Sequence, residues 1–149
     1  MKTNRRRLLS VALGGLLMLM VSAPAGAAEG IRLKVSVVHA TKTKGKVDPA
    51  LARIRGSLQK AFGGYASFKQ VAKHELSLAK GKKVSVKLPN KKSAAVTYKG
   101  KTGAQHLINL AIPESKVNVD LRALPRRIFY QAGLKHKNGI LILAFYLKE

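Results

Sequence analysis

The feature that most constrains the fold of this chain is a succession of short segments in which apolar and polar residues alternate. The first segment is Ile31–Ala40, in which Leu33, Val35 and Val37 fall on one face. Such alternation is typical of a β-strand with one buried face, because successive side chains point to opposite sides. Further candidate strands cover residues 65–71 and 74–78 (which could form one long strand with a break), 84–88, 94–98, 107–112, 117–121, 128–130 and 140–146.

Only one segment has helical periodicity. Asp48-Pro49 supplies an N-cap residue followed by proline at the first helical position. Leu51, Ile54 and Leu58 then recur at helical spacing until Gly63-Gly64 ends the pattern. We therefore predict an α+β domain with one amphipathic helix after the first strand. An antiparallel β-sandwich or partly closed barrel of about six further strands is expected to follow.

The N-terminal residues resemble a cleaved secretory signal. Arg5-Arg6-Arg7 precedes an apolar run over Leu8–Val21, and small residues occupy Ala23–Ala28. The apolar run of about 14 residues is shorter than the ~20 that a membrane-spanning helix needs. The three arginines also fit a twin-arginine signal, so both export routes remain open. We predict export to the periplasm or the extracellular space, with residues 1–28 removed and 29–149 forming a single basic domain without a membrane-spanning segment.

The net charge is far from zero. The chain has 29 Lys+Arg against 6 Asp+Glu, and residues 1–28 hold four of the basic residues and none of the acidic ones. Residues 29–149 therefore carry a formal charge of +19. Solubility alone needs a net charge of only about 2–8 on a small domain, and the excess favours attraction to polyanions. The alternative is that the lysines only keep loops solvated and strand edges unpaired.

The basic residues concentrate in predicted turns. If the strands after the helix form a simple meander, alternate turns share one end of the sheet. Seven basic residues would then meet as one positive rim, the candidate polyanion-binding site: Lys80, Lys82, Lys83, Lys99, Lys101, Arg126 and Arg127.

Motifs for catalysis or metal binding are lacking in the sequence. The chain has no cysteine and no Gly-x-Ser-x-Gly elbow, and its four histidines have no metal-ligand spacing. We therefore predict no enzyme activity, catalytic residue, cofactor or metal. A glycosidase-like carboxylate pair would require Glu75 and Asp120 to converge. The preference for lysine over arginine, and aromatic residues that fall on core faces, argue against a nucleic-acid ligand.

The order of short motifs resembles that of small exported bacterial domains of unknown function. The segments that carry this resemblance are Val37-Val38-His39-Ala40, Val47-Asp48-Pro49-Ala50-Leu51, Tyr65-Ala66-Ser67-Phe68-Lys69, Val86-Lys87-Leu88-Pro89-Asn90 and Gly139-Ile140-Leu141-Ile142-Leu143-Ala144. The resemblance implies a recurrent envelope-associated domain, and it implies no catalytic or ligand-binding residues.

These observations predict an exported, non-enzymatic binding or adaptor domain. Its expected partner is an anionic lipid, an anionic cell-surface polymer or an acidic envelope protein. The alternative is a structural subunit of an envelope or secretion assembly, joined by pairing at an exposed strand edge. Either Ile31–Ala40 or Ile140–Tyr146 would supply that edge.

Overall fold

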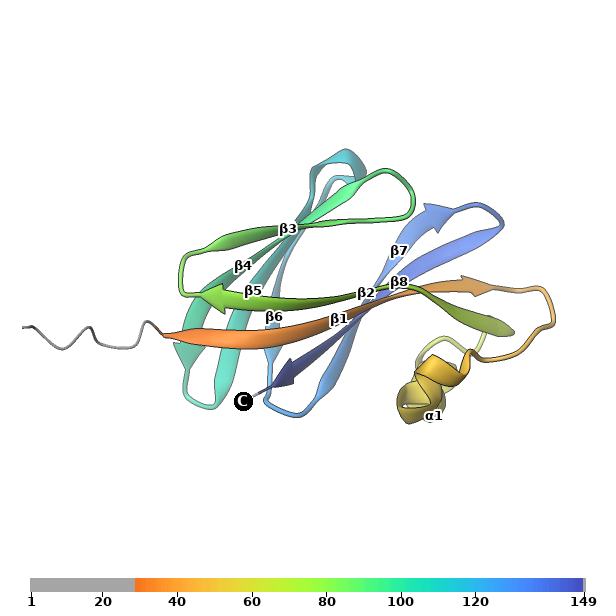
Figure 1. Ribbon diagram of the computed structural model, residues 1–149, viewed down its shortest axis with the longest axis horizontal. Helices are drawn as coiled ribbons and strands as arrows, with labels where there is room; N and C mark the ends of the chain where they lie inside the picture. The colour runs from red at the N-terminus through yellow and green to blue at the C-terminus, as the bar shows by residue number, and fades with distance from the viewer. Residues whose placement is uncertain (1–28, 149) are drawn as a thin grey trace, which may run out of the picture.

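A computed structural model describes residues 29–148 as two four-stranded antiparallel sheets that pack against each other as an open sandwich (Figure 1). Sheet A has the order β2-β1-β8-β7, and sheet B has the order β3-β4-β5-β6. The strands of sheet A are β1 (Gly30–Thr41), β2 (Ser67–Ala79), β7 (Ile128–His136) and β8 (Gly139–Lys148). The strands of sheet B are β3 (Lys83–Lys87), β4 (Ser93–Thr102), β5 (Gln105–Ile112) and β6 (Val117–Ala123), with a 3-10 turn, η2 (Pro113–Ser115), between the last two.

The main core lies between the two sheets. Leu33, Val35 and Val37 are at most 2% exposed, as their alternation in β1 predicts. They belong to the same buried cluster as Ile108 and Leu110 of sheet B. The α+β class and the antiparallel sheets are therefore confirmed, and the strands of residues 29–148 form two sheets that do not close into a barrel.

The predicted helix needs a correction. The first strand is followed by a 3-10 helix, η1 (Pro49–Ile54), and only then by a short α-helix, α1 (Arg55–Ala61). The Asp48 carboxylate accepts hydrogen bonds from the backbone N–H of Ala50 and of Gln70, so the start of η1 is tied to β2. Tight 3-10 turns are common at helix starts, and Gly56 inside α1 disfavours a longer α-helix.

The helical segment covers part of the outer face of sheet A. Leu51 and Leu58 are almost fully buried and form a second apolar cluster with Val38, Ala40 and Ile142. This cluster explains why the apolar residues of the predicted helix recur at helical spacing.

Several strand boundaries also differ from the prediction. Residues 65–71 and 74–78 contribute to one long strand, β2, which contains a β-bulge. The expected short strand at 128–130 is the nine-residue β7. Lys99-Gly100-Lys101 falls between the predicted strands at 94–98 and 107–112, but it lies within β4, where Gly100 follows a β-bulge and has a φ of 120°. The described chain thus has seven strands after the first one, against about six expected.

The two segments predicted as docking edges are central strands. β1 lies between β2 and β8, and β8 lies between β1 and β7. The prediction of Ile31–Ala40 or Ile140–Tyr146 as an exposed edge is therefore wrong. The physical reason is the continuous burial of residues 141–145, which pack against sheet B on one face and partly beneath the helical segment on the other.

The predicted signal at 1–28 lies outside the described residues. Within the part of the chain that the structure describes, no helix has the length and apolar character required to cross a membrane.

Candidate anion-binding surface

The turn between β2 and β3 brings its lysines beside β4. Gly81 donates a backbone hydrogen bond of 2.7 Å to the carbonyl of Tyr98, and Lys83 pairs with Thr97. A Cβ atom on Gly100 would lie only 2.9 Å from Cε of Lys80. The meander holds within sheet B, and Lys80, Lys82 and Lys83 therefore lie close to the end of β4, where Lys99 and Lys101 are found.

Lys99 and Lys101 differ in their surroundings, because the bulge at Gly100 interrupts the alternation of β4. Lys99 turns to the outer face of sheet B, where its Nζ atom lies 3.0 Å from a carboxylate oxygen of Asp120. Hydrogen bonds from Asn109 and then from Lys99 lower the pKa of Asp120. Lys101 instead lines a cavity at the end of the sandwich.

Arg126 and Arg127 lie in the turn between β6 and β7, at the same end of the molecule (Figure 1). The backbone N–H of Arg126 donates to the carbonyl of Leu147, so this turn is fixed beside the last residues of β8. In the strand order of the sandwich, the β2–β3 turn and the β6–β7 turn occupy opposite edges of this end. The rim is therefore spread across the end of the sandwich and is not one compact cluster.

A buried tyrosine organises one side of the rim. The hydroxyl of Tyr98 donates to a carboxylate oxygen of Glu29 at 3.1 Å and lies 2.9 Å from Nδ1 of His106. Burial of the phenol, together with the Glu29 carboxylate, raises the pKa of Tyr98 to about 12. The other oxygen of Glu29 lies 3.5 Å from Nζ of Lys80, so Glu29 joins the buried phenol to a rim lysine.

A cavity of about 610 Å³, here called the end cavity, opens at this end between the first residues of β1 and the β4–β5 hairpin. The ionisable side chains that line it are all basic or imidazole groups: Arg32, Lys101, His106 and Lys148. Arg32 and Lys148 are register partners on β1 and β8. The end cavity thus extends the positive surface from the rim onto sheet A.

The outer face of sheet A carries basic residues that the sequence analysis did not assign to a site. Nζ of Lys34 and Nζ of Lys148 lie 3.7 Å and 3.5 Å from the same oxygen of Glu75. A hydrogen bond with Lys148 and repulsion from its charge lower the pKa of Lys34, and the charge of Lys148 lowers the pKa of Glu75. The polar face of β1 was visible in the sequence, but the register that adds Lys73 and Lys148 was not.

The carboxylate pair proposed for a glycosidase-like site is not formed. Glu75 is on the outer face of sheet A, paired with Lys34 in register, and Asp120 is on the outer face of sheet B. The two groups therefore point away from each other across the sandwich.

The histidines are partly paired in space. His39 and His136 have ring centroids 5.0 Å apart, and Nε2 of His39 lies 3.2 Å from the carbonyl oxygen of His136. Within residues 29–148, no group of three or more histidine, cysteine or acidic residues is arranged to hold a metal ion.

The chain was compared with protein-family models, curated protein sequences and solved structures. No protein-family model, no curated protein sequence and no solved structure matches the chain. The resemblance to small exported domains therefore stays a prediction from short motifs.

Proposed function

We propose that this protein is an exported, non-enzymatic binding domain that contacts an anionic component of the cell envelope through the rim. The observation that supports the proposal is that basic residues from the β2–β3 turn, β4 and the β6–β7 turn all lie at one end of the sandwich, spread from one edge to the other. The end cavity beside them is lined by further basic side chains.

The carboxylates compensate little of this charge. Residues 29–148 contain 25 basic and five acidic side chains. Asp48 and Glu114 accept hydrogen bonds from backbone N–H groups. The other three carboxylates form ion pairs with Lys34, Lys80, Lys99 and Lys148. Exposed ion pairs contribute only about 0–1 kcal/mol, so a polyanion can readily compete for these lysines.

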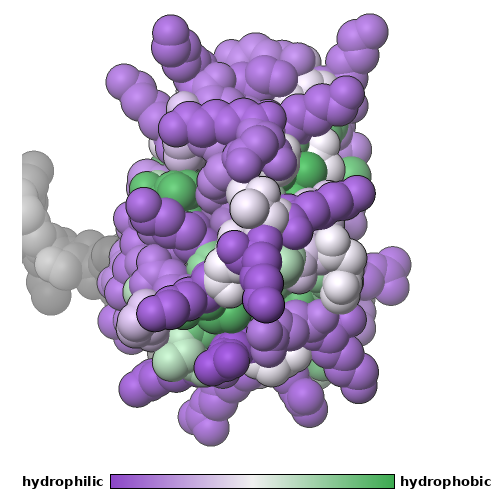
Figure 2. All heavy atoms as spheres, turned by 90° about the vertical axis from the view of Figure 1, so that its right-hand side faces the viewer, coloured by the Kyte–Doolittle hydropathy of each residue, from purple (hydrophilic) through white to green (hydrophobic). Residues whose placement is uncertain are grey.

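The experiment must separate the rim from general positive charge. Figure 2 faces the end opposite the rim, and hydrophilic side chains cover much of that end as well. A fivefold rim variant replaces Lys80, Lys82, Lys83, Lys99 and Lys101 by serine. A control variant with the same loss of charge replaces Lys42, Lys44, Lys46, Lys135 and Lys137, which lie in the β1–η1 loop and near the β7–β8 turn.

Binding of residues 29–149 to vesicles containing anionic lipid, and to lipopolysaccharide, would be measured at low and high salt. We expect the rim variant to lose at least ten times more affinity than the control variant, and salt to weaken binding of the unaltered protein. Equal losses in the two variants would contradict the rim proposal. Co-purification from membranes that persists in high salt would favour assembly by strand pairing instead, at the edges formed by β2, β3, β6 or β7.

A further inference from the structure

A second cavity lies on the outer face of sheet A, beside the helical segment. It has a volume of about 630 Å³, within the 300–1,000 Å³ typical of small-molecule sites. We call it the η1 cleft; its lining residues are Lys34, Ser36, Ala50, Leu51, Arg53, Ile54, Gln70, Lys73, Ile128, Ala144, Phe145 and Tyr146. None of the seven rim residues is among them.

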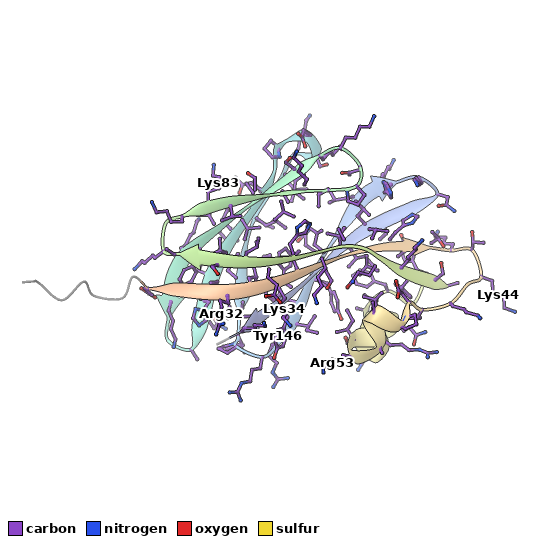
Figure 3. All side chains as sticks on the ribbon, in the orientation of Figure 1. Arg32, Lys34, Lys44, Arg53, Lys83 and Tyr146 are labelled. Carbon is purple, nitrogen blue, oxygen red and sulfur yellow. The ribbon has the colours of Figure 1, made fainter. Side chains whose placement is uncertain are left out.

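The cleft exists because the sheet carries small side chains where the helical cover ends. Ser36 of β1 and Ala144 of β8 are register partners and form the floor. One step further along the strands, Lys34 and Tyr146 are also partners and form a wall. Ile54 of η1 also lines the cleft. Figure 3 shows Lys34, Tyr146 and the helical segment with Arg53 on the same side of sheet A.

The polar part of the cleft is positively charged. Lys34, Arg53 and Lys73 line it from β1, η1 and β2, and no carboxylate is among the lining residues. Glu75, the acidic neighbour of Lys34, is shared with Lys148. Three cations brought together with one shared carboxylate nearby repel one another, and a bound anion would relieve that repulsion.

The rest of the cleft is apolar. Leu51, Ile54, Ile128 and Tyr146 contribute apolar surface, and Ile54, Ile128 and Tyr146 remain partly exposed to solvent. An inorganic anion would leave this surface exposed to water, whereas an apolar group would cover it and gain about 25 cal/mol per Å² buried. The lining therefore fits a ligand with two chemically different parts.

We infer that the η1 cleft binds an amphiphilic anion, in which a phosphate or carboxylate head contacts Lys34, Arg53 and Lys73 and an apolar tail packs on Ile54, Ile128 and Tyr146. Ser36 and Gln70 supply further hydrogen-bonding groups beside the head. The inference does not depend on the rim, because the two sites share no residue.

The test uses residues 29–149 and four probes in isothermal titration calorimetry: dodecyl phosphate below its micelle concentration, inorganic phosphate, uncharged dodecyl maltoside, and vesicles containing phosphatidic acid. We expect dodecyl phosphate to bind at least tenfold more tightly than either inorganic phosphate or dodecyl maltoside. The vesicles distinguish a bilayer lipid from a free amphiphile as the source of the same chemistry. Binding to vesicles without binding of dodecyl phosphate would overturn the inference.

Two variants localise the site. Replacing exposed Arg53 and Lys73 by glutamine removes two charged contacts, and it should weaken dodecyl phosphate binding about tenfold or more. The matched control replaces Lys87 and Lys135 by glutamine and so removes the same number of charges. Both lysines are exposed and lie outside the cleft and the rim. Unchanged affinity in the first variant, or an equal loss in the control, would refute the inference.

A charge-neutral variant and amide mapping complete the test. Ser36→Leu fills the floor of the cleft without changing the charge, so it should also abolish dodecyl phosphate binding. In NMR spectra of the unaltered protein, the ligand should shift the backbone amides of Ser36, Lys73 and Ala144. Shifts centred on Lys82 and Lys101 would assign the ligand to the rim and contradict the cleft site.

Discussion

The hydroxyl of Tyr98 provides the sharpest test of how the basic end of the sandwich is organised. Its side chain is fully buried, and its hydroxyl bonds to Glu29 and His106. The substitution Tyr98→Phe removes that hydroxyl and leaves the aromatic ring in the core. At about pH 8 we expect the variant to be less stable by about 1.5–3 kcal/mol, the usual contribution of a hydrogen bond that involves a charged partner.

The size of this difference should depend on pH. The pKa of Tyr98 is raised to about 12 in the folded protein, from an ordinary value of 10.0. Between these two values the unfolded chain releases the phenolic proton and the folded protein keeps it, so stability falls as the pH rises. The loss is about 1.4 kcal/mol by about pH 11 and about 2.3 kcal/mol by about pH 12. Because the phenylalanine variant has no phenol to ionise, the stability advantage of tyrosine should be about 1.4 kcal/mol smaller at pH 11 than at pH 8.

Urea denaturation of both proteins between about pH 8 and pH 11.5 measures this difference, and ionisation of the lysines largely cancels in the comparison. Tyr146→Phe is the matched control, since Tyr146 lies on the outer face of sheet A and is partly exposed. A stability advantage of Tyr98 that stays constant across the whole pH range would refute the account of a buried phenol held neutral by its surroundings.

Two further predictions concern the opposite end of the sandwich. Gly139→Ala should destabilise the protein by several kcal/mol in urea denaturation, because the new Cβ atom would clash with the backbone oxygen of Ala40. The control Gly64→Ala should cost far less, since its new Cβ atom meets nothing within 4 Å. Burial and then the charge of His39 lower the pKa of His136 below its ordinary 6.5, so the folded state resists protonation. Stability should therefore fall as the pH drops below about 6.5, and His136→Gln should flatten this acid limb of the stability profile; an identical profile in the variant would exclude the assignment.

Local pattern was enough to predict which residues of the first strand face the core. Leu33, Val35 and Val37 are buried as their alternation indicates, because side chains in a strand point to opposite faces regardless of which strand lies beside it. Local pattern did not show that Lys99-Gly100-Lys101 continues the strand that begins before it. A glycine with positive φ fits a turn or a bulge equally well, and only pairing with β5 distinguishes the two.

The two candidate sites differ in how far they could be predicted from the sequence. The proximity of Lys80 and Lys83 to β4 was predictable, since neighbouring strands joined by a short turn must pair at that turn. The η1 cleft was not, because Lys34, Arg53 and Lys73 come from β1, η1 and β2 and meet only through strand order and register.

The order of amino acids alone is enough to define the class of the domain, the inward face of the first strand, the start of the helical segment at Asp48-Pro49 and the large excess of positive charge. These are local or additive properties, and neighbouring residues suffice to define them. The three-dimensional fold shows in addition that the last strand returns to pair with the first, which makes both of them central. It also decided which basic residues are paired with carboxylates and which line a cavity, because those contacts join residues that lie far apart in the chain.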